Sequence, residues 1–159
     1  MNTRSPQQLI DLFDAKPVIV FEEMQKALNS ASRATVFRHL NKVNYRSSYN
    51  HNGRYYTKND LTRYDKHGIF FYKDIYFSRD GNLVSTITRL VCESSAGQTQ
   101  RELQELLKVR VQTSLTAMVY NKKLVRIKVA GNFIYLHPDS KKHKVQLLKR
   151  NDRRAQMCD

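Results

Sequence analysis

The sequence predicts a helix-rich α+β protein in which one small module, three helices followed by a two-stranded hairpin, occurs twice. Apolar residues recur at helical spacing in two separate stretches of the chain. Each stretch is followed by a glycine-containing turn between strand-forming residues. The two sets of landmarks share a nearly constant offset. This offset favours an internal duplication over two unrelated units of similar size.

The first module is expected over residues 1–60. Ser5 before Pro6 gives a cap residue and a proline at the first helical position, which predicts a helix over residues 5–14. The β-branched run Val18–Val20 predicts a short strand. Two more helices are predicted by helical spacing, one through Phe21, Met24, Ala27 and Leu28 and one, capped by Ser32, through Val36, Phe37, Leu40 and Val43. Asn52-Gly53 predicts a hairpin between residues 45–51 and 54–58.

The second module is expected over residues 82–137. A first helix is marked by Leu83, Ile87, Leu90 and Val91, and Ala96-Gly97 is expected to end it. Thr99 and Glu102 form a capping box for the next helix. After a bend at 108–110, a third helix is predicted through Leu115, Met118 and Val119. A hairpin is predicted around residues 130–132.

The offset between the modules is 79 residues through the second helix and 78 after it. Met24 and Leu28 correspond to Leu103 and Leu107 at an offset of 79. Phe37 and Gly53 correspond to Leu115 and Gly131 at an offset of 78. One residue is therefore lost in the turn between the second and third helices.

Residues 61–81 are expected to form an aromatic, partly stranded connector that packs between the modules. Its rings would otherwise be exposed to solvent; they are Tyr64, Phe70, Phe71, Tyr72, Tyr76 and Phe77. Residues 138–159 form a basic tail. Val145 and Leu148 give this tail only a marginal amphipathic helix, so disorder in the absence of DNA is expected.

Charge indicates a polyanionic partner. The chain has 28 Lys and Arg residues against 14 Asp and Glu, a formal net charge of +14. Residues 24–59 and 106–138 contain no acidic residue, although both are rich in Lys and Arg. Both stretches cover the same part of the repeat, from the turn before the third helix through the hairpin. Charges of both signs normally mix on a solvated face, so this repeated segregation favours nucleic-acid binding.

A base-reading surface is expected on the third helix of the first module. On a helical wheel the predicted outward residues are Thr35, Arg38, His39 and Lys42. The residues expected to contact the DNA backbone or to lie on a wing hairpin are Arg33, Arg46, Arg54, Tyr55, Lys58, Lys122, Lys123, Arg126 and Lys128. In the second module the outward face of the third helix is nearly neutral, with Thr113, Thr116 and Tyr120. The two modules are therefore expected to have unequal roles.

This pattern resembles the winged helix-turn-helix superfamily, whose modules have three helices and a two-stranded wing. Residues 34–40 read Ala-Thr-Val-Phe-Arg-His-Leu. They are similar to the recognition helix of ferric uptake regulators, which commonly read Ala-Thr-Val-Tyr-Arg followed by Leu. The resemblance implies two tandem winged helix-turn-helix modules that bind DNA. The sequence lacks the histidine and carboxylate metal sites of those regulators, so metal sensing is not implied.

No catalytic, cofactor or metal site is expected. The sequence has no glycine-rich phosphate loop, no GxSxG and no HExxH motif, and its basic regions lack a cluster of acidic metal ligands. The five histidines have no metal-site spacing. Cys92 and Cys158 do not suggest a disulfide framework. The longest apolar run is too short to span a membrane, so we expect a cytoplasmic, non-enzymatic protein.

The predicted function is binding of double-stranded DNA with sequence preference. A transcriptional regulator, or the DNA-recognition part of a mobile-element or defence system, fits this prediction. One alternative is a winged-helix scaffold that binds a protein partner through the second module or the connector. A nonspecific nucleic-acid binder is another. Structured RNA is less favoured, because a recognition helix fits the wide major groove of B-form DNA better than the narrow one of A-form RNA.

Overall fold

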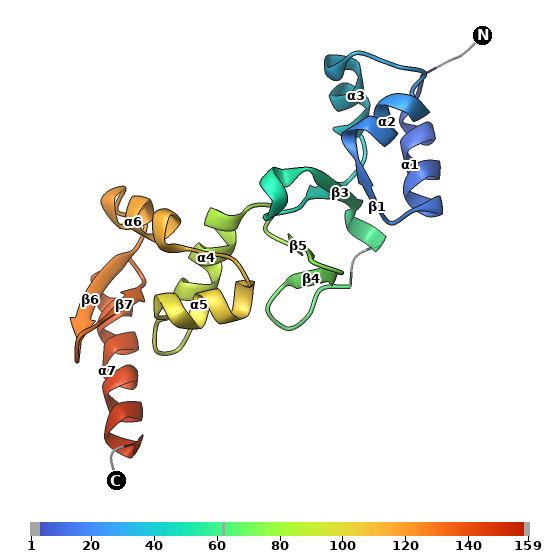
Figure 1. Cartoon of the computed structure of the whole chain (residues 1–159). Coiled ribbons are helices and arrows are strands. Elements are labelled where there is room, and N and C mark those ends of the chain that lie inside the picture. Colours follow the sequence, from blue (N-terminus) through green and yellow to red (C-terminus); the bar gives the residue numbers. More distant parts are fainter. Residues whose placement is uncertain (1–3, 62, 158–159) are drawn as a thin grey trace. The chain divides into compact units, whose positions relative to one another are not determined.

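The computed structural model describes residues 4–61 and 63–157, which form two compact units that divide between Leu83 and Val84 (Figure 1). The described residues contain seven α-helices and seven short strands. The strands form three small antiparallel sheets, one with three strands and two with two. The predicted helix-rich α+β class is therefore confirmed.

The first unit begins with three helices and a strand, in the predicted order. Helix α1 spans Pro6–Ala15, strand β1 spans Val18–Val20, and helices α2 and α3 span Phe21–Ala27 and Arg33–Leu40. The backbone N–H of Ser5 donates to Oε1 of Gln8 at 2.9 Å, which satisfies a group at the start of α1. The N–H of Thr35 donates to Oγ of Ser32 at 3.3 Å and so caps α3.

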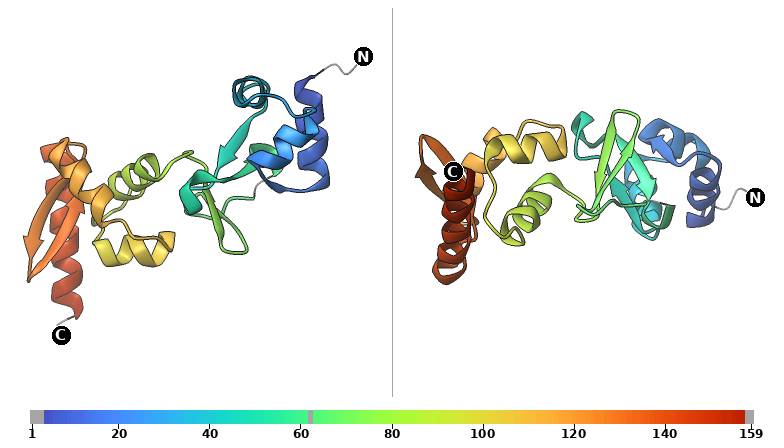
Figure 2. Two further views of the ribbon diagram at one scale, coloured as in Figure 1. Left: turned by 45° about the horizontal axis from the view of Figure 1, so that its top comes forward. Right: turned by 90° about the horizontal axis from the view of Figure 1, so that it is seen from below.

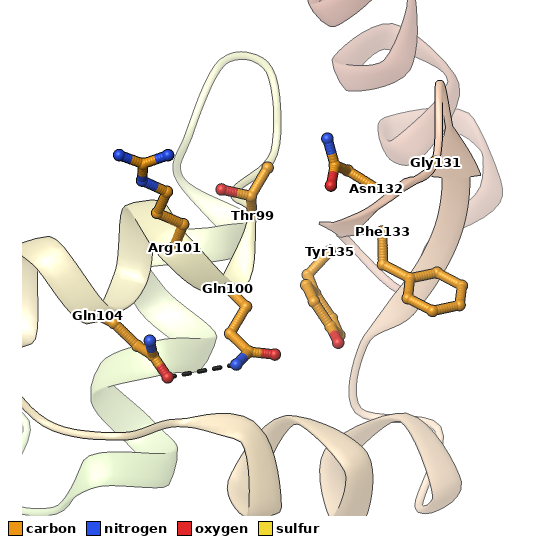
Figure 3. Close-up of a pocket in the computed structure, with 8 residues that line it drawn as sticks. All are labelled: Thr99, Gln100, Arg101, Gln104, Gly131, Asn132, Phe133 and Tyr135. Carbon is orange, nitrogen blue, oxygen red and sulfur yellow. Dashed lines mark hydrogen bonds between the residues drawn. The ribbon is translucent and has the colours of Figure 1, made fainter.

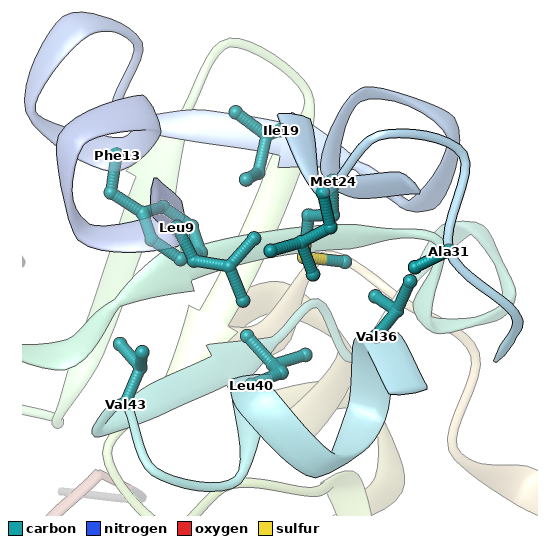
Figure 4. Packing of buried hydrophobic residues seen from close by; sticks show 9 residues of the cluster. Leu9, Phe13, Ile19, Met24, Ala31, Val36, Leu40 and Val43 are labelled. Atoms are coloured by element: carbon teal, nitrogen blue, oxygen red, sulfur yellow. The ribbon is translucent and has the colours of Figure 1, made fainter. Parts of the chain in front are cut away.

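The three helices enclose one apolar core (Figure 4). Its buried residues are Leu9, Phe13, Ile19, Met24, Leu28, Ala31, Val36, Leu40 and Val43. Each fully buried aliphatic or aromatic side chain contributes about 1.5–3 kcal/mol relative to exposure. The stripe that predicted each helix therefore also fixes which face of that helix points inward.

The hairpin of the first unit differs from its predicted form. Strands β2 (Tyr45–Ser47) and β3 (Tyr55–Lys58) are shorter than expected, and a 3-10 turn, η1, occupies His51–Gly53. The segment between the strands bonds elsewhere: the N–H of Tyr49 donates to the carbonyl of Tyr76, and the Asn50 side chain donates to the carbonyl of Asp74 at 2.7 Å. These bonds compete with extension of the β2–β3 ladder.

The connector is a third element of the first unit. After a short 3-10 turn, η2 (Asn59–Leu61), strands β4 (Ile69–Tyr72) and β5 (Ile75–Ser78) form an antiparallel hairpin, as the aromatic content predicted. A small second cluster joins Ile75 and Phe77 to Val18 of β1, with Tyr55 packed beside it. The described contacts therefore make this hairpin part of the fold of the first unit.

The second unit follows the same order of helices. Helix α4 spans Leu83–Cys92, α5 spans Gln100–Leu107 and α6 spans Gln112–Tyr120. The Thr99 cap is as predicted, because its hydroxyl accepts the N–H of Glu102 at 3.1 Å. Strands β6 (Val125–Val129) and β7 (Asn132–Leu136) are joined by a two-residue turn, Ala130-Gly131, one residue tighter than expected.

The predicted end of α4 is wrong. The helix ends at Cys92 and not at Ala96-Gly97, because side chains satisfy the carbonyls of its last turn: the Ser94 hydroxyl donates to the carbonyl of Val91 at 2.8 Å. Gly97 has a φ of +69° and lies against β7. It places Gln98 in a two-hydrogen-bond bridge to Tyr135, with N···O distances of 3.0 and 2.8 Å.

Within each unit, the β segment before the second helix pairs with the second strand of the hairpin, and the paired residues correspond between the units. In the first unit β1 pairs with β3, so that Ile19 lies opposite Tyr56 in a sheet of order β1-β3-β2. In the second unit Gln98 lies opposite Tyr135, and both partners are displaced by 79 residues. The offset of 78 expected after the second helix therefore returns to 79 within the hairpin, between Gly131 and Tyr135. The correspondence found in the apolar pattern therefore extends to hydrogen bonding.

The expectation of a disordered tail is wrong. Residues Ser140–Met157 form helix α7, which lies next to β7 in both views of Figure 2. Val145 and Leu148, on which the prediction depended, are exposed. The helix is attached instead by Gln146, which is 5% exposed, and by Arg150. Apolar periodicity could not find this attachment because polar side chains make it.

Hydrogen bonds to the main chain hold α7 in place. Nε2 of Gln146 donates to the carbonyls of Val91 and Ser94, at 2.9 Å each, and its Oε1 accepts the N–H of His137 at 2.8 Å. Arg150 donates to the carbonyls of Ala96 and Gly97, at 2.9 Å each, and pairs with Glu102 at 2.8 Å.

No helix within residues 4–61 and 63–157 is both long and apolar enough to cross a membrane.

Candidate nucleic-acid interface

Helix α3 and the turn that follows it present two free cationic side chains to solvent: Arg38 lies on the helix, but Lys42, predicted on the same helical face, lies in the turn because the helix ends at Leu40. Arg38 and Lys42 are exposed, and neither side chain has a hydrogen-bond or ion-pair partner among the described residues. Thr35 is half-buried, and its Oγ1 accepts a hydrogen bond from the Ser32 hydroxyl at 3.0 Å. This face can therefore offer a guanidinium, an ammonium and a hydroxyl group to an external polyanion.

The outward orientation predicted for His39 is wrong. His39 is 7% exposed, and neither ring nitrogen has a hydrogen-bond partner within the part of the chain that the structure describes. It lies three residues after Val36 and next to Leu40, both of which are buried in the core. The spacing of three from Val36 places it on the flank of the inward face of α3. Burial, with the positive charges of Arg38, Lys42 and Arg4, lowers the pKa of His39 from 6.5.

We expect His39 to make the first unit less stable in mild acid. Because its pKa is lower in the folded state than in the unfolded chain, the unfolded chain takes up a proton first as pH falls below 6.5. The contribution of neutral His39 to the free energy of unfolding should be fully present above pH 6.5. It should be lost as pH falls from 6.5 to the lower pKa of His39 in the folded state. Urea unfolding at a series of pH values measures this slope.

Two substitutions test the role of His39. His39→Leu removes the titrating group and should flatten the slope while keeping stability at neutral pH within about 1 kcal/mol of the parent. His67→Leu, at a half-buried histidine of the connector, is the control for exchanging a histidine for leucine outside the α3 core. A parent slope that survives in His39→Leu would contradict the assignment.

The residues of the first unit that were predicted to contact the DNA backbone differ in how far they are already bonded within the protein. Arg54 is exposed and has no side-chain partner among the described residues, while Lys58 pairs with Asp60 at 3.2 Å. The Arg46 guanidinium donates to the carbonyl of Arg79 at 3.2 and 3.3 Å and so ties β2 to the end of the connector hairpin. Arg46 and Lys58 are therefore partly used to hold the fold.

Arg33 lies over an aromatic cluster at the start of α3. Its guanidinium carbon is 5.3 Å from the ring centroid of Phe21 and 5.0 Å from that of Phe37, and these two rings stack at 5.8 Å. Tyr56 meets the Phe37 ring edge-on at 6.3 Å. The stacking leaves the N–H groups at the guanidinium edge available to an anion and limits the conformations of the side chain.

In the second unit, the outward face of α6 carries no charge. Thr113, Thr116 and Tyr120 are all exposed, as the helical wheel predicted, and Tyr120 is 86% exposed. Together with Gln112, Ala117 and Asn121 they line a hollow of about 650 Å³. This face offers hydroxyl groups, carboxamides and one aromatic ring.

The positive charges predicted to contact DNA in the second unit lie on its hairpin and in the turn before it, and α7 adds more. Lys122, Lys123, Arg126 and Lys128 are exposed. The Arg126 guanidinium lies 4.5 Å from the ring centroid of Phe133, and the Lys128 ammonium lies 5.9 Å from it. Helix α7 adds the exposed cations Lys141, Lys142, Lys144, Lys149, Arg153 and Arg154.

Each unit has a cleft at the same position of the repeat, between the start of its second helix and its hairpin. The cleft of the first unit, about 330 Å³, is lined by Val20, Phe21, Glu22, Arg33 and residues 52–56. The cleft of the second unit, about 430 Å³, is lined by Thr99, Gln100, Arg101, Gln104, Gly131, Asn132, Phe133 and Tyr135 (Figure 3). An offset of 79 relates Val20, Phe21, Glu22 and Tyr56 to Thr99, Gln100, Arg101 and Tyr135.

Sequence reasoning selected Arg33, Arg54 and Tyr55 of the first cleft, as residues that contact the DNA backbone or lie on a wing, and none of the residues that line the second cleft. A signal for the others was present, because four pairs of residues that line the two clefts share the offset of 79 that aligned the apolar residues of the second helices. Within the described parts of the chain, no group of three or more His, Cys, Asp or Glu residues is arranged to hold a metal ion.

A scan against known protein families found no match, and searches of curated proteins and of solved structures found no significant match.

Proposed function

We propose that this protein binds double-stranded DNA through two tandem winged helix-turn-helix modules. In this proposal, α3 reads base edges in the major groove, and the hairpins and α7 contact the DNA backbone. The observation that carries it is the exposure of Arg38 on α3 and of Lys42 in the turn after it, both without partners among the described residues and within a stretch without acidic side chains. An Arg side chain can donate two hydrogen bonds to guanine in the major groove.

The order of elements supports the winged-helix assignment. Each unit has a helix, a short β segment, two helices and a hairpin, and the β segment pairs with the second strand of the hairpin. In such modules the third helix enters the major groove and the hairpin lies over the adjacent backbone. Arg38 then falls on the reading helix, and Arg54 and Lys128 fall on the hairpins.

The charge distribution supports unequal roles for the two units. In the first unit, exposed cations occupy the third helix itself, whereas in the second unit the outward face of α6 is neutral and exposed cations lie on β6 and α7. Phosphate contacts set register and affinity, and base contacts set sequence preference. We therefore assign sequence preference to the first unit. A transcriptional regulator, or the DNA-recognition part of a mobile-element or defence system, needs this combination.

The proposal is tested by selecting bound sequences from a random duplex library. The affinities of the parent, Arg38→Ala and Lys128→Ala for the selected and for a random duplex are then compared. Arg38→Ala should reduce the affinity ratio between selected and random duplex by about 5- to 150-fold, the effect of one bidentate base contact. Lys128→Ala should weaken both duplexes about equally and make binding less dependent on salt. Arg63→Ala, at an exposed arginine of the connector, is the matched control and should keep the parent ratio.

Two outcomes would contradict the proposal in different ways. A parent protein that enriches no sequence would be a nonspecific binder. An Arg38→Ala variant with the parent ratio would remove the base-reading role from α3. The exposure of Tyr120 favours one other candidate, a scaffold that binds a protein through α6, and partners crosslinked at Tyr120 would support it.

A further inference from the structure

The cleft between α5 and β7 differs from its counterpart in the first unit in its chemistry. None of its lining residues is acidic, whereas Glu22 lines the cleft of the first unit. Three of its side chains are carboxamides, from Gln100, Gln104 and Asn132. A carboxamide offers a donor and an acceptor side by side, the same pair that the edge of a nucleobase presents.

The carboxamides keep hydrogen-bonding capacity. Nε2 of Gln100 donates to Oε1 of Gln104 at 3.3 Å, and the same oxygen accepts the N–H of Val111 at 3.3 Å. Oε1 of Gln100, Nε2 of Gln104 and the Asn132 amide have no partner within the part of the chain that the structure describes. Figure 3 shows Gln100 and Asn132 on opposite sides of the cleft. A planar polar group between them would meet donors and acceptors from both walls.

Aromatic rings and positive charge lie at the same place. Phe133, 41% exposed, and the buried Tyr135 line the cleft on the β7 side. Arg126 and Lys128 lie against the Phe133 ring. Aromatic faces that stack on bases, beside cations that follow the phosphates, are the combination with which proteins bind unpaired nucleotides. A base paired inside a duplex keeps both its faces covered and cannot use this cleft.

We propose that this cleft binds an unpaired nucleobase of a DNA strand that leaves the duplex held by the first unit. The second unit then contacts the duplex backbone near its end and in addition recognises a single-stranded tail or an opened end, which agrees with the neutral face of α6. The base stacks on the aromatic side of the cleft and its edge meets the carboxamides, while Arg126 and Lys128 contact the adjoining phosphates. This inference rests on the proposed duplex binding by the first unit.

Fluorescence anisotropy with the whole chain tests it on two ligands, a blunt duplex and the same duplex with a short unpaired tail. The tail should increase affinity about tenfold, which corresponds to one stacked base. Phe133→Ala should abolish that advantage and leave affinity for the blunt duplex within about twofold of the parent. Phe71→Ala is the matched control, because Phe71 is 42% exposed on a strand of the first unit, and it should keep the advantage.

A second variant and a second signal keep the test independent of folding defects. Gln100→Ala, on the surface of α5, should reduce the tail advantage without altering the circular dichroism spectrum. A 2-aminopurine in the tail should change its emission on binding the parent protein and not on binding Phe133→Ala. Equal parent affinity for tailed and blunt duplex would overturn the inference while leaving duplex binding intact. If the parent protein does not bind the blunt duplex but still changes the emission of 2-aminopurine in a single strand, the proposed function alone would be overturned.

Discussion

Gly97→Ala is expected to lower the free energy of unfolding of the second unit by about 3 kcal/mol, the sum of left-handed backbone strain and overpacking. Gly97 has a φ of +69°, and a Cβ there would lie 2.7 Å from the carbonyl oxygen of Tyr135. It would also lie 2.6 Å from a methyl carbon of Leu136. The main chain of β7 cannot move away without breaking the bridge between Gln98 and Tyr135.

Gly131→Ala is the matched control for this prediction. Gly131 also has a positive φ, +87°, but a Cβ there would meet nothing within 4 Å. Gly131→Ala should therefore lower the free energy of unfolding only by the cost of backbone strain, about 1 kcal/mol. Urea unfolding followed by circular dichroism gives both values, and hydrogen exchange of residues 84–157 assigns the loss to the second unit. Equal destabilisation by the two substitutions would contradict the steric account.

Gln146→Leu is expected to destabilise the attachment of α7 by about 3 kcal/mol, because it removes three hydrogen bonds and leaves two part-buried main-chain groups without partners among the described residues. These two groups are the carbonyl of Ser94 and the N–H of His137, whereas the Val91 carbonyl keeps the Ser94 hydroxyl as its donor. The variant should show faster hydrogen exchange throughout α7 and a lower unfolding midpoint. Its greater hydrophobicity cannot compensate for the loss, since the leucine would lie among polar main-chain atoms.

The matched control is the reverse exchange on the same helix. Leu148→Gln replaces an exposed apolar residue and should change stability by less than about 0.5 kcal/mol. If α7 were held by its apolar residues, as its sequence alone suggests, the two substitutions would show the opposite order. The pair therefore decides between polar and apolar attachment.

The order and positions of the elements could be predicted because apolar periodicity and caps act locally. The stripe through Val36 and Leu40 and the Ser32 cap define α3 without knowledge of the rest of the chain. The hairpin of the first unit was less predictable. Asn52-Gly53 favours a tight turn, but the Asn50 side chain bonds to the connector, 24 residues away, and the ladder stops at Ser47.

The site was predicted only where exposure follows from the helical wheel. Arg38 and Lys42 point outward, whereas His39 lies close enough to the apolar stripe to be buried despite its polarity. The clefts require the second helix and the hairpin to approach in space, which no local pattern specifies. Arg46 shows the same limit, since its partner is a carbonyl 33 residues further along the chain.

The attachment of α7 has a consequence for how the second unit tolerates mutation. Gln146 and Arg150 bind carbonyl oxygens of residues 91–97, which every amino acid supplies. The exposed side chain at Glu93 can therefore vary without detaching the helix, whereas Gln146 and Arg150, which reach across from α7, cannot. For the bonds made to these carbonyls, the sequence constraint falls on the side chains of α7 and not on those of the residues that supply the carbonyls.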